Sequence, residues 1–138
     1  LAKEDLDAAR QRLMDTLANY ASYKQCRLVL VFDGYKVKGN RGTTFDYHSI
    51  QVVFTKENET GDMYIEKLIQ EIGRNFAVRV ATSDGLIQLS ALRAGVLRVT
   101  AGELLHEVEF VLEQMARAIE AWNKKGSAHP QRGKRTKP

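Results

Sequence analysis

The sequence has little cysteine and no long apolar run. Cys26 is its single cysteine in 138 residues, which excludes an internal disulfide framework and a zinc site built from several cysteines. One cysteine is also typical of a reducing compartment. No apolar run approaches the ~20 residues of a membrane span, and the charged start, residues 1–5, lacks the apolar segment of a secretory signal peptide. We therefore expect a cytoplasmic protein with no membrane partner.

Several catalytic motifs are also missing. The sequence contains neither of the phosphate-binding patterns G-x-x-x-x-G-K-S/T and G-x-G-x-x-G, which excludes nucleotide hydrolysis of the P-loop kind. His48, His106 and His129 do not have the spacing of a metal site. Ser83 and Cys26 have no partnered histidine at a recognisable spacing, so a nucleophilic triad is not expected.

Charge is plentiful but unevenly distributed. Six of the 21 lysines and arginines lie in residues 124–138, which contain no acid, so 15 basic residues face 17 acidic ones in the rest of the chain. We expect one domain at 1–123 followed by a basic, disordered tail at 124–138. Such a tail suits a polyanion such as RNA, although a solubilising tail without a specific partner fits the composition equally well.

Hydrophobic periodicity predicts helices that alternate with strands. Two helices, which have apolar residues at three- and four-residue steps, are expected at about 4–23 and 60–73, and a short helix is expected at 86–94. The apolar face of the first helix is expected at Leu6, Ala9, Leu13, Leu17 and Tyr20. The strands are expected at 28–32, 50–55, 77–82 and 96–99. The first strand does not alternate, which is typical of burial on both faces, and residues 34–48 are expected to form a loop.

A last helix is expected to begin with a capping box. Thr100 and Glu103 match the S/T-x-x-E pattern in front of an apolar stripe that continues to about residue 124. The side chains of this stripe, including a methionine and a tryptophan, are expected to pack rather than to bind a ligand. They are Leu104, Val108, Val111, Met115, Ile119 and Trp122.

Acidic residues follow three of the predicted strands. The alternation of strands and helices predicts an α/β fold with a mostly parallel sheet, in which functional groups collect at the carboxyl ends of the strands. Asp33 follows the first strand, Glu59 and Asp62 the second, and Asp84 the third. Clustered carboxylates repel one another unless a cation lies between them, and oxygen ligands favour Mg²⁺ or Mn²⁺. Each aspartate also has a structural explanation, as a turn, cap or first-turn residue.

Four stretches of the sequence carry a family resemblance. They are V-F-D-G-Y-K-V-K-G at 31–39, V-F-T-K-E-N-E-T-G-D-M-Y-I-E at 53–66, V-A-T-S-D-G at 80–85 and G-V-L-R-V-T-A-G-E-L-L at 95–105. Together they resemble the YacP-like branch of the NYN domains, and the similarity extends to about residue 113. The combination of E-T-x-D-x-x-I-E with T-S-D is its most specific part.

This resemblance implies a PIN-like, three-layer fold. It also implies the activity of a metal-dependent endoribonuclease, and some members of the family cleave messenger RNA at the ribosome. It implies that Asp62 and Asp84 are catalytic residues that bind Mg²⁺ or Mn²⁺. Asp33 and Glu59 would be weaker partners of the same ion, and Glu66 flanks the central aspartate.

The sequence departs from the family pattern at its start. The family begins with a strand that carries a D-G-Y-N motif, and nothing of that kind precedes the first helix here. We therefore expect a fragment of a longer protein. Because the strand belongs in the middle of the sheet, its absence would leave its neighbours with unpaired edges and the acidic cluster one carboxylate short. A smaller departure is Gly61, where alanine is commoner.

The loop after the first strand is a candidate RNA-binding segment. Lys36, Lys38 and Arg41 offer phosphate contacts, and Tyr35 and Tyr47 offer stacking surfaces. A solvated, mobile connection is the alternative.

Three functions stay open at this point. The leading hypothesis is the endoribonuclease, with messenger RNA and the ribosome as partners. The second is a non-catalytic RNA- or ribosome-binding module with a degenerate nuclease site. The third is a Rossmann-like phosphatase or receiver-type domain with a nucleophilic aspartate and a partnered lysine.

Overall fold

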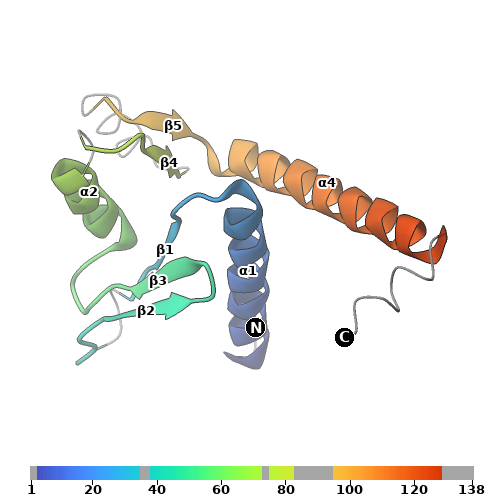
Figure 1. Cartoon of the computed structure of the whole chain (residues 1–138). Helices are drawn as coiled ribbons and strands as arrows, with labels where there is room; N and C mark the ends of the chain where they lie inside the picture. The colour runs from blue at the N-terminus through green and yellow to red at the C-terminus, as the bar shows by residue number, and fades with distance from the viewer. Residues whose placement is uncertain (1–2, 35–37, 73–74, 83–94, 129–138) are drawn as a thin grey trace, which may run out of the picture.

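The computed structural model describes residues 3–34, 38–72, 75–82 and 95–128. Its elements, shown in Figure 1, are α1 (Lys3–Lys24), β1 (Val29–Phe32), β2 (Thr43–Tyr47), β3 (Ile50–Phe54), α2 (Gly61–Ile72), β4 (Arg79–Ala81), β5 (Leu97–Val99) and α4 (Ala101–Ala128). Apart from β2, which was not predicted, the described elements follow the predicted order of helices and strands. The helix predicted at 86–94 lies outside the described residues.

The strands form two sheets in the described part of the chain. In the first sheet β3 lies in the middle, parallel to β1 and antiparallel to β2. The second sheet pairs β4 with β5 in parallel. Both parallel pairs agree with the predicted α/β fold. Among the described residues, β1 and β2 are the outer strands of the first sheet.

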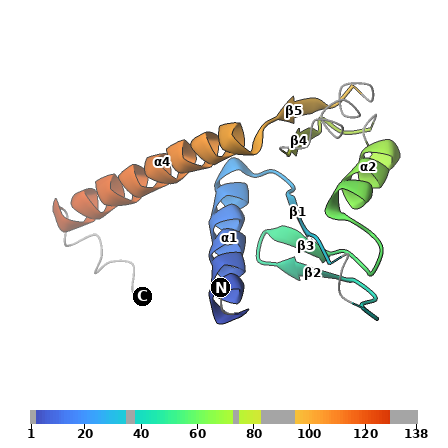
Figure 2. The same ribbon diagram turned by 180° about the vertical axis from the view of Figure 1, so that it is seen from behind.

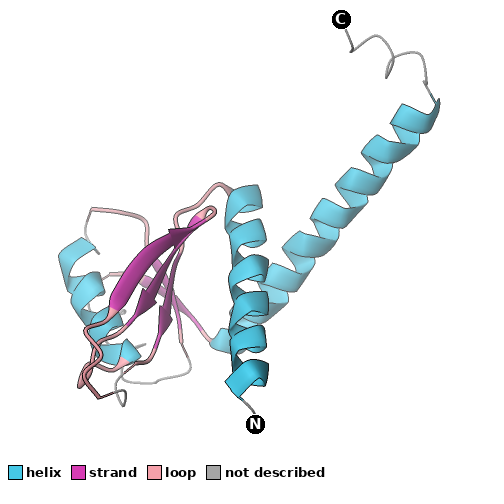
Figure 3. Cartoon of the chain, turned by 90° about the horizontal axis from the view of Figure 1, so that it is seen from below, coloured by secondary structure: helices cyan, strands magenta, loops and turns pink. Residues whose placement is uncertain are grey.

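Helices cover both faces of the strands, as Figure 3 shows from below. The larger core lies where α1, β3 and the first half of α4 meet, around Ala21, Val52 and Val108. A smaller core joins α2 to β4 and β5 through Ile69 and Val80. Since α2 leads from the carboxyl end of β3 to the amino end of β4, it links the two sheets along the chain.

The prediction of a loop over 34–48 was wrong, because β2 occupies its second half. Residues of β2 alternate in burial, with Phe45 and Tyr47 turned toward the protein. A two-residue connection, in which His48 has a φ of 52°, returns the chain into β3. The alternation in T-T-F-D-Y was the available signal, and the glycines and charges before it obscured it.

Two predicted apolar faces are only partly buried. In α1 the buried side includes Met14, Leu17 and Ala18. The predicted stripe was wrong at Leu6 and Leu13, which are 46% and 41% exposed, and at Ala9, which is also exposed. The strand β1 was predicted to be buried on both faces, yet none of its residues is fully buried, because only β3 pairs with it among the described residues.

The last helix is longer and more exposed than predicted. It continues to Ala128, so the predicted end near residue 124 was too early. Val108 and Val111 pack as predicted, but Ile119 and Trp122 are 57% and 70% exposed. Figures 1 and 2 show the reason, since the second half of α4 projects away from the body of the protein. In the described ranges, no helix has the length and apolarity needed to cross a membrane.

Candidate active site

The carboxyl ends of β1 and β3 are joined beyond the last strand pair. The backbone N–H of Thr55 donates to the carbonyl of Phe32 over 3.1 Å, and the N–H of Gly34 donates to Thr55 Oγ1 over 2.8 Å. Thr55 is 1% exposed, and its hydroxyl has this partner inside the protein. An unpaired buried hydroxyl would destabilise the fold, so the bond from Gly34 to Thr55 is favoured. The two bonds lie on either side of Asp33 in the chain and therefore fix its backbone at the end of β1.

Asn40 holds the following loop against the same strand ends. Its Nδ2 donates to the carbonyl of Thr55 over 2.8 Å and to that of Gly34 over 3.3 Å. Its Oδ1 accepts from the N–H of Gly42 over 2.9 Å. This role of Asn40 was not predicted from the sequence, although an asparagine between glycines is a recognised turn signal. Asn40 therefore fixes the loop to the ends of both strands.

The first turn of α2 brings Asp62 to this end of the sheet. Thr60 caps the helix, because its Oγ1 accepts from the N–H of Met63 over 3.0 Å. A Cβ added to Gly61 would lie 3.6 Å from Val31 Cγ1 and 3.9 Å from Asp33 Cβ. Asp33 therefore lies against the start of the helix in which Asp62, half-buried, is the second residue.

The chemistry of these donors fits a hard divalent cation. Asp33 and Asp62 supply carboxylate oxygens, the ligands that Mg²⁺ and Mn²⁺ prefer. Among the described residues, no group of three or more histidine, cysteine, aspartate or glutamate side chains could hold a metal. Asp84, the third predicted ligand, lies outside the described residues. The predicted set of ligands therefore stays a prediction.

The carboxylate of Glu59 forms an ion pair with Lys67, a residue of α2. The carboxylate lies 3.8 Å from Lys67 Nζ, and the side chain of Glu59 is 14% exposed. Its N–H donates to the carbonyl of Lys56 over 3.0 Å. The role predicted for Glu59 at a metal stays a prediction, as does that of Glu66, which is exposed on α2.

The predicted RNA-binding residues have different positions. Arg41 lines a hollow between the β2–β3 hairpin and α2, and Lys38 is exposed in the loop before it. Tyr35 and Lys36 lie outside the described residues. Tyr47 lies near the hairpin turn at the far end of β2, where its hydroxyl donates to Asp15 of α1. The structure thus separates Tyr47 from Arg41.

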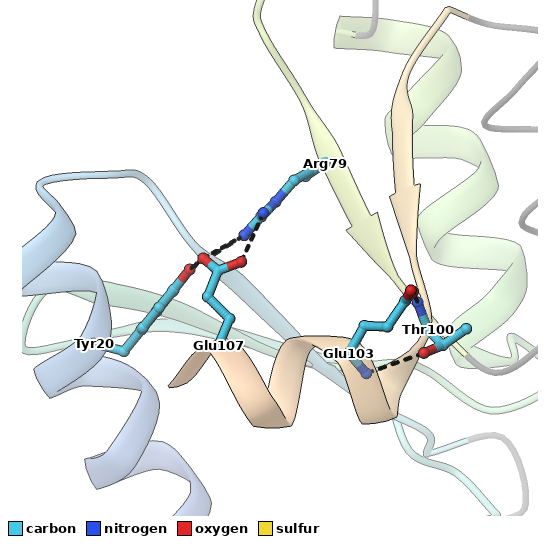
Figure 4. Close-up of polar contacts among 5 residues, drawn as sticks. All are labelled: Tyr20, Arg79, Thr100, Glu103 and Glu107. Atoms are coloured by element: carbon cyan, nitrogen blue, oxygen red, sulfur yellow. Dashed lines mark hydrogen bonds and ion pairs between the residues drawn. The ribbon is translucent and has the colours of Figure 1, made fainter. Parts of the chain in front are cut away.

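A polar network away from this site joins β4 to α1 and α4 (Figure 4). Arg79 of β4 donates two hydrogen bonds of 2.8 Å to the carboxylate of Glu107 on α4. The hydroxyl of Tyr20 on α1 donates to the same carboxylate and accepts from Arg79 over 3.2 Å. The predicted capping box lies one turn earlier in α4 and is confirmed, with reciprocal bonds of 2.8 and 3.0 Å between Thr100 and Glu103.

These contacts shift the titration of the network. The hydrogen bonds from Arg79 and Tyr20 lower the pKa of Glu107 from 4.5 to about 2. Burial and then the hydrogen bond to Glu107 raise the pKa of Tyr20 from 10.0 to about 12. A carboxyl with a lowered pKa stabilises the fold above its unfolded value and loses that contribution as the pH falls through its folded value. The network therefore loses its stabilising contribution between about pH 4.5 and about pH 2.

Replacing Glu107 by glutamine is expected to reduce the free energy of unfolding by about 2 kcal/mol at neutral pH, because charged hydrogen bonds are lost at side chains that water only partly screens. The difference from the unmodified protein should shrink as the pH falls below about 4.5, which urea unfolding at a series of pH values measures. Glu113→Gln is the control, because its pair with Arg117 on the same helix is 3.5 Å long and exposed. An equal, pH-independent loss in both variants would contradict the prediction.

Comparisons with known proteins all lead to one family. A family model described as the YacP-like NYN domain matches residues 1–137. The protein YacP of Bacillus subtilis (strain 168) is 40% identical over 121 residues, which cover 86% of this chain and 70% of that protein. The crystal structure of Rae1 (YacP) from Bacillus subtilis matches with a TM-score of 0.71 at 36% identity, covering 94% of this chain and 75% of that one. A crystal structure of a mutant of the same protein gives a TM-score of 0.74 at 35% identity, covering 90% and 72%.

Proposed function

Because this chain belongs to the YacP-like NYN family, a family of PIN-like nuclease domains, we propose that it is a metal-dependent endoribonuclease that hydrolyses phosphodiester bonds within RNA. The PIN-like fold expected from the sequence is confirmed by the same comparisons. The observation that carries the proposal is the contact of Asp33 with the start of α2, beside Asp62. This contact supports the proposal because it brings Asp33 close to the helix start that carries Asp62.

Asp62, Asp84 and Asp33, with Glu59 as a weaker partner, would hold Mg²⁺ or Mn²⁺. Such an ion, when bound, activates water and offsets the negative charge that develops on the phosphate. Asp33 and Asp62 contribute the hard oxygen atoms for it. The amino end of α2 contributes a partial positive charge, which also favours a phosphate at this place.

Several residues of the chain keep these carboxylates in place. Thr55 and Asn40 fix the strand end that carries Asp33. Thr60 fixes the first turn of the helix that carries Asp62. A nuclease site needs ligands held to within a fraction of an ångström, and these hydrogen bonds limit the freedom of both backbone segments.

The substrate and the setting follow from the family resemblance. Messenger RNA on the ribosome is the proposed substrate, and with that substrate the protein would work in the cytoplasm. The basic C-terminal residues would add phosphate contacts that carry no sequence preference.

A second candidate is a non-catalytic RNA-binding module. It is favoured by the described residues taken alone, because no three histidine, cysteine, aspartate or glutamate side chains among them are grouped closely enough to hold a metal ion. This candidate predicts RNA affinity without cleavage, which makes the two functions separable in one assay.

The test uses the full-length protein and a circular, fluorescently labelled RNA, which only an endonuclease can open. We expect linear products with Mn²⁺ or Mg²⁺ and none with EDTA, because in the proposed mechanism the metal ion activates the attacking water. RNA binding without cleavage under all conditions would favour the second candidate. Cleavage that continues in EDTA would contradict the metal-dependent mechanism.

A further inference from the structure

We infer that a basic groove between α2 and the β2–β3 hairpin binds single-stranded RNA and leads it to the carboxylates at the start of α2. The groove is a hollow of about 230 Å³. The inference rests on the proposed function, because it names the path of the substrate at that site. It also assigns binding to Lys56, Tyr64 and Lys67, which the sequence analysis did not single out.

The groove carries an excess of positive charge. Arg41, Lys56 and Lys67 reach it from three separate parts of the chain, and all three are exposed. Glu59 is the single carboxylate among its lining residues, and it is paired with Lys67. Cations that converge from different elements match the repeated charges of a phosphate backbone.

The basic wall of the groove is held in a fixed position. Gly42 has a φ of +79°, and a Cβ added to it would lie 3.2 Å from both the backbone nitrogen of Lys56 and the carbonyl oxygen of Phe54. Only a residue without a side chain brings the Arg41 segment this close to Lys56. The Asn40 bonds hold the same segment, so Arg41 and Lys56 are placed before any ligand arrives.

The groove ends beside the candidate active site. Tyr64 follows Gly61 by three residues, so both lie on nearly the same side of α2. Gly61 contacts the segment of Val31 and Asp33, whereas Tyr64 lines the groove. A strand of RNA in the groove would therefore continue to Asp33 within about one turn of the helix.

Tyr64 distinguishes single-stranded RNA from other polyanions. Its half-buried ring lines the groove and offers a flat surface on which an unpaired base can stack. Thr43 and Thr44, which are both exposed, also line the groove, and a threonine hydroxyl can bond to phosphate or to a ribose hydroxyl. An acidic peptide would use the cations but would have no base to place on the ring.

The test measures binding of a fluorescein-labelled single-stranded RNA in EDTA, so that cleavage plays no part. The triple variant Arg41→Ala, Lys56→Ala, Lys67→Ala is compared with a control, Arg12→Ala, Arg98→Ala, Arg117→Ala, whose residues are exposed and do not line the groove. Both variants keep the basic tail and lose the same charge. We expect the groove variant to bind about tenfold to a hundredfold more weakly, with a log–log salt slope smaller by about 2.

Tyr64 provides a second, independent variant. Tyr64→Leu is expected to weaken binding of single-stranded RNA about tenfold, whereas Tyr64→Phe should restore it because the ring is retained. Neither change should affect binding of a blunt duplex, whose bases are already stacked. Circular dichroism of each variant checks that the fold is intact.

The outcomes separate this inference from the proposed function. If both triple variants lose affinity equally, or if polyglutamate of equal charge displaces RNA as well as RNA itself does, the groove is not the RNA site and the inference is overturned. The nuclease assay is unaffected by that result. If only the groove variant loses affinity but the protein cleaves nothing, the groove stands and the nuclease proposal fails.

Discussion

Replacing Asp62 by asparagine is expected to lower the rate of RNA cleavage at least about a hundredfold. Asparagine keeps the size of the side chain but removes a negative oxygen donor, and loss of a group that holds a catalytic metal costs at least as much as loss of its outer partners. RNA affinity in EDTA should stay within about twofold, since binding depends on cations. Initial cleavage rates at saturating Mn²⁺ and binding curves measure the two effects.

The matched control for this variant is Asp46→Asn. Asp46 is an exposed aspartate of β2, opposite Gln51 and toward the hairpin turn, so it lies at the other end of the sheet. Its removal changes the net charge by the same amount and should leave the rate unchanged. Asp62→Asn also loses a favourable interaction with the amino end of α2, worth at most about 1 kcal/mol of stability. Cleavage that survives Asp62→Asn at the unmodified rate would remove the proposed active site.

Local signals in the sequence predicted the elements around this site. The helix over 60–73 was predicted from its apolar spacing and is found at Gly61–Ile72, and the capping box of Thr100 and Glu103 was predicted with both of its hydrogen bonds. These features depend on residues three or four positions apart, so the sequence contains all the information that they need.

The features that were missed depend on residues far apart in the chain. Asn40 bonds to Thr55 fifteen positions later, and Arg79 pairs with Glu107 twenty-eight positions later. Nothing near Arg79 in the sequence indicates its partner. Similarly, Trp122 has the spacing of a core residue, but the helix projects beyond the part of the protein that would cover it. Periodicity predicts a face of a helix and not what lies opposite.

The proposed cluster of carboxylates follows from a rule about parallel sheets and stays a prediction. Parallel strands place their carboxyl ends together, and this rule brought Asp33 and Asp62 into one hypothesis that the contact at Gly61 supports. Glu59 was assigned to the same cluster, and its role there stays a prediction; in the structure its carboxylate pairs with Lys67 in the neighbouring groove. A turn at the end of a strand can direct a side chain toward either face of the sheet. The spacing of residues in the sequence does not determine which face it is.

Gly34 is the position where the smallest substitution should have the largest effect on stability. A Cβ at this residue would lie 2.2 Å from the carbonyl oxygen of Thr55 and 2.6 Å from Asn40 Nδ2. The asparagine side chain can move, but the Thr55 carbonyl belongs to the backbone that continues from β3. The strand ends would have to separate, and the bond from the N–H of Gly34 to Thr55 Oγ1 would break.

Gly34→Ala is therefore expected to reduce the free energy of unfolding by about 3 kcal/mol, from overpacking together with an unpaired buried hydroxyl. Gly102→Ala is the control, because its added Cβ would meet only Thr100 Oγ1 at 3.9 Å, and alanine favours a helix. Urea unfolding gives both values, and hydrogen exchange at Thr55 shows whether the strand ends have opened. Because the same separation moves Asp33 away from α2, cleavage should fall in Gly34→Ala even where the protein is still folded. If the alanine variant were as stable and active as the unmodified protein, the close approach of Gly34 to Thr55 would not be what holds the carboxyl ends of β1 and β3 together.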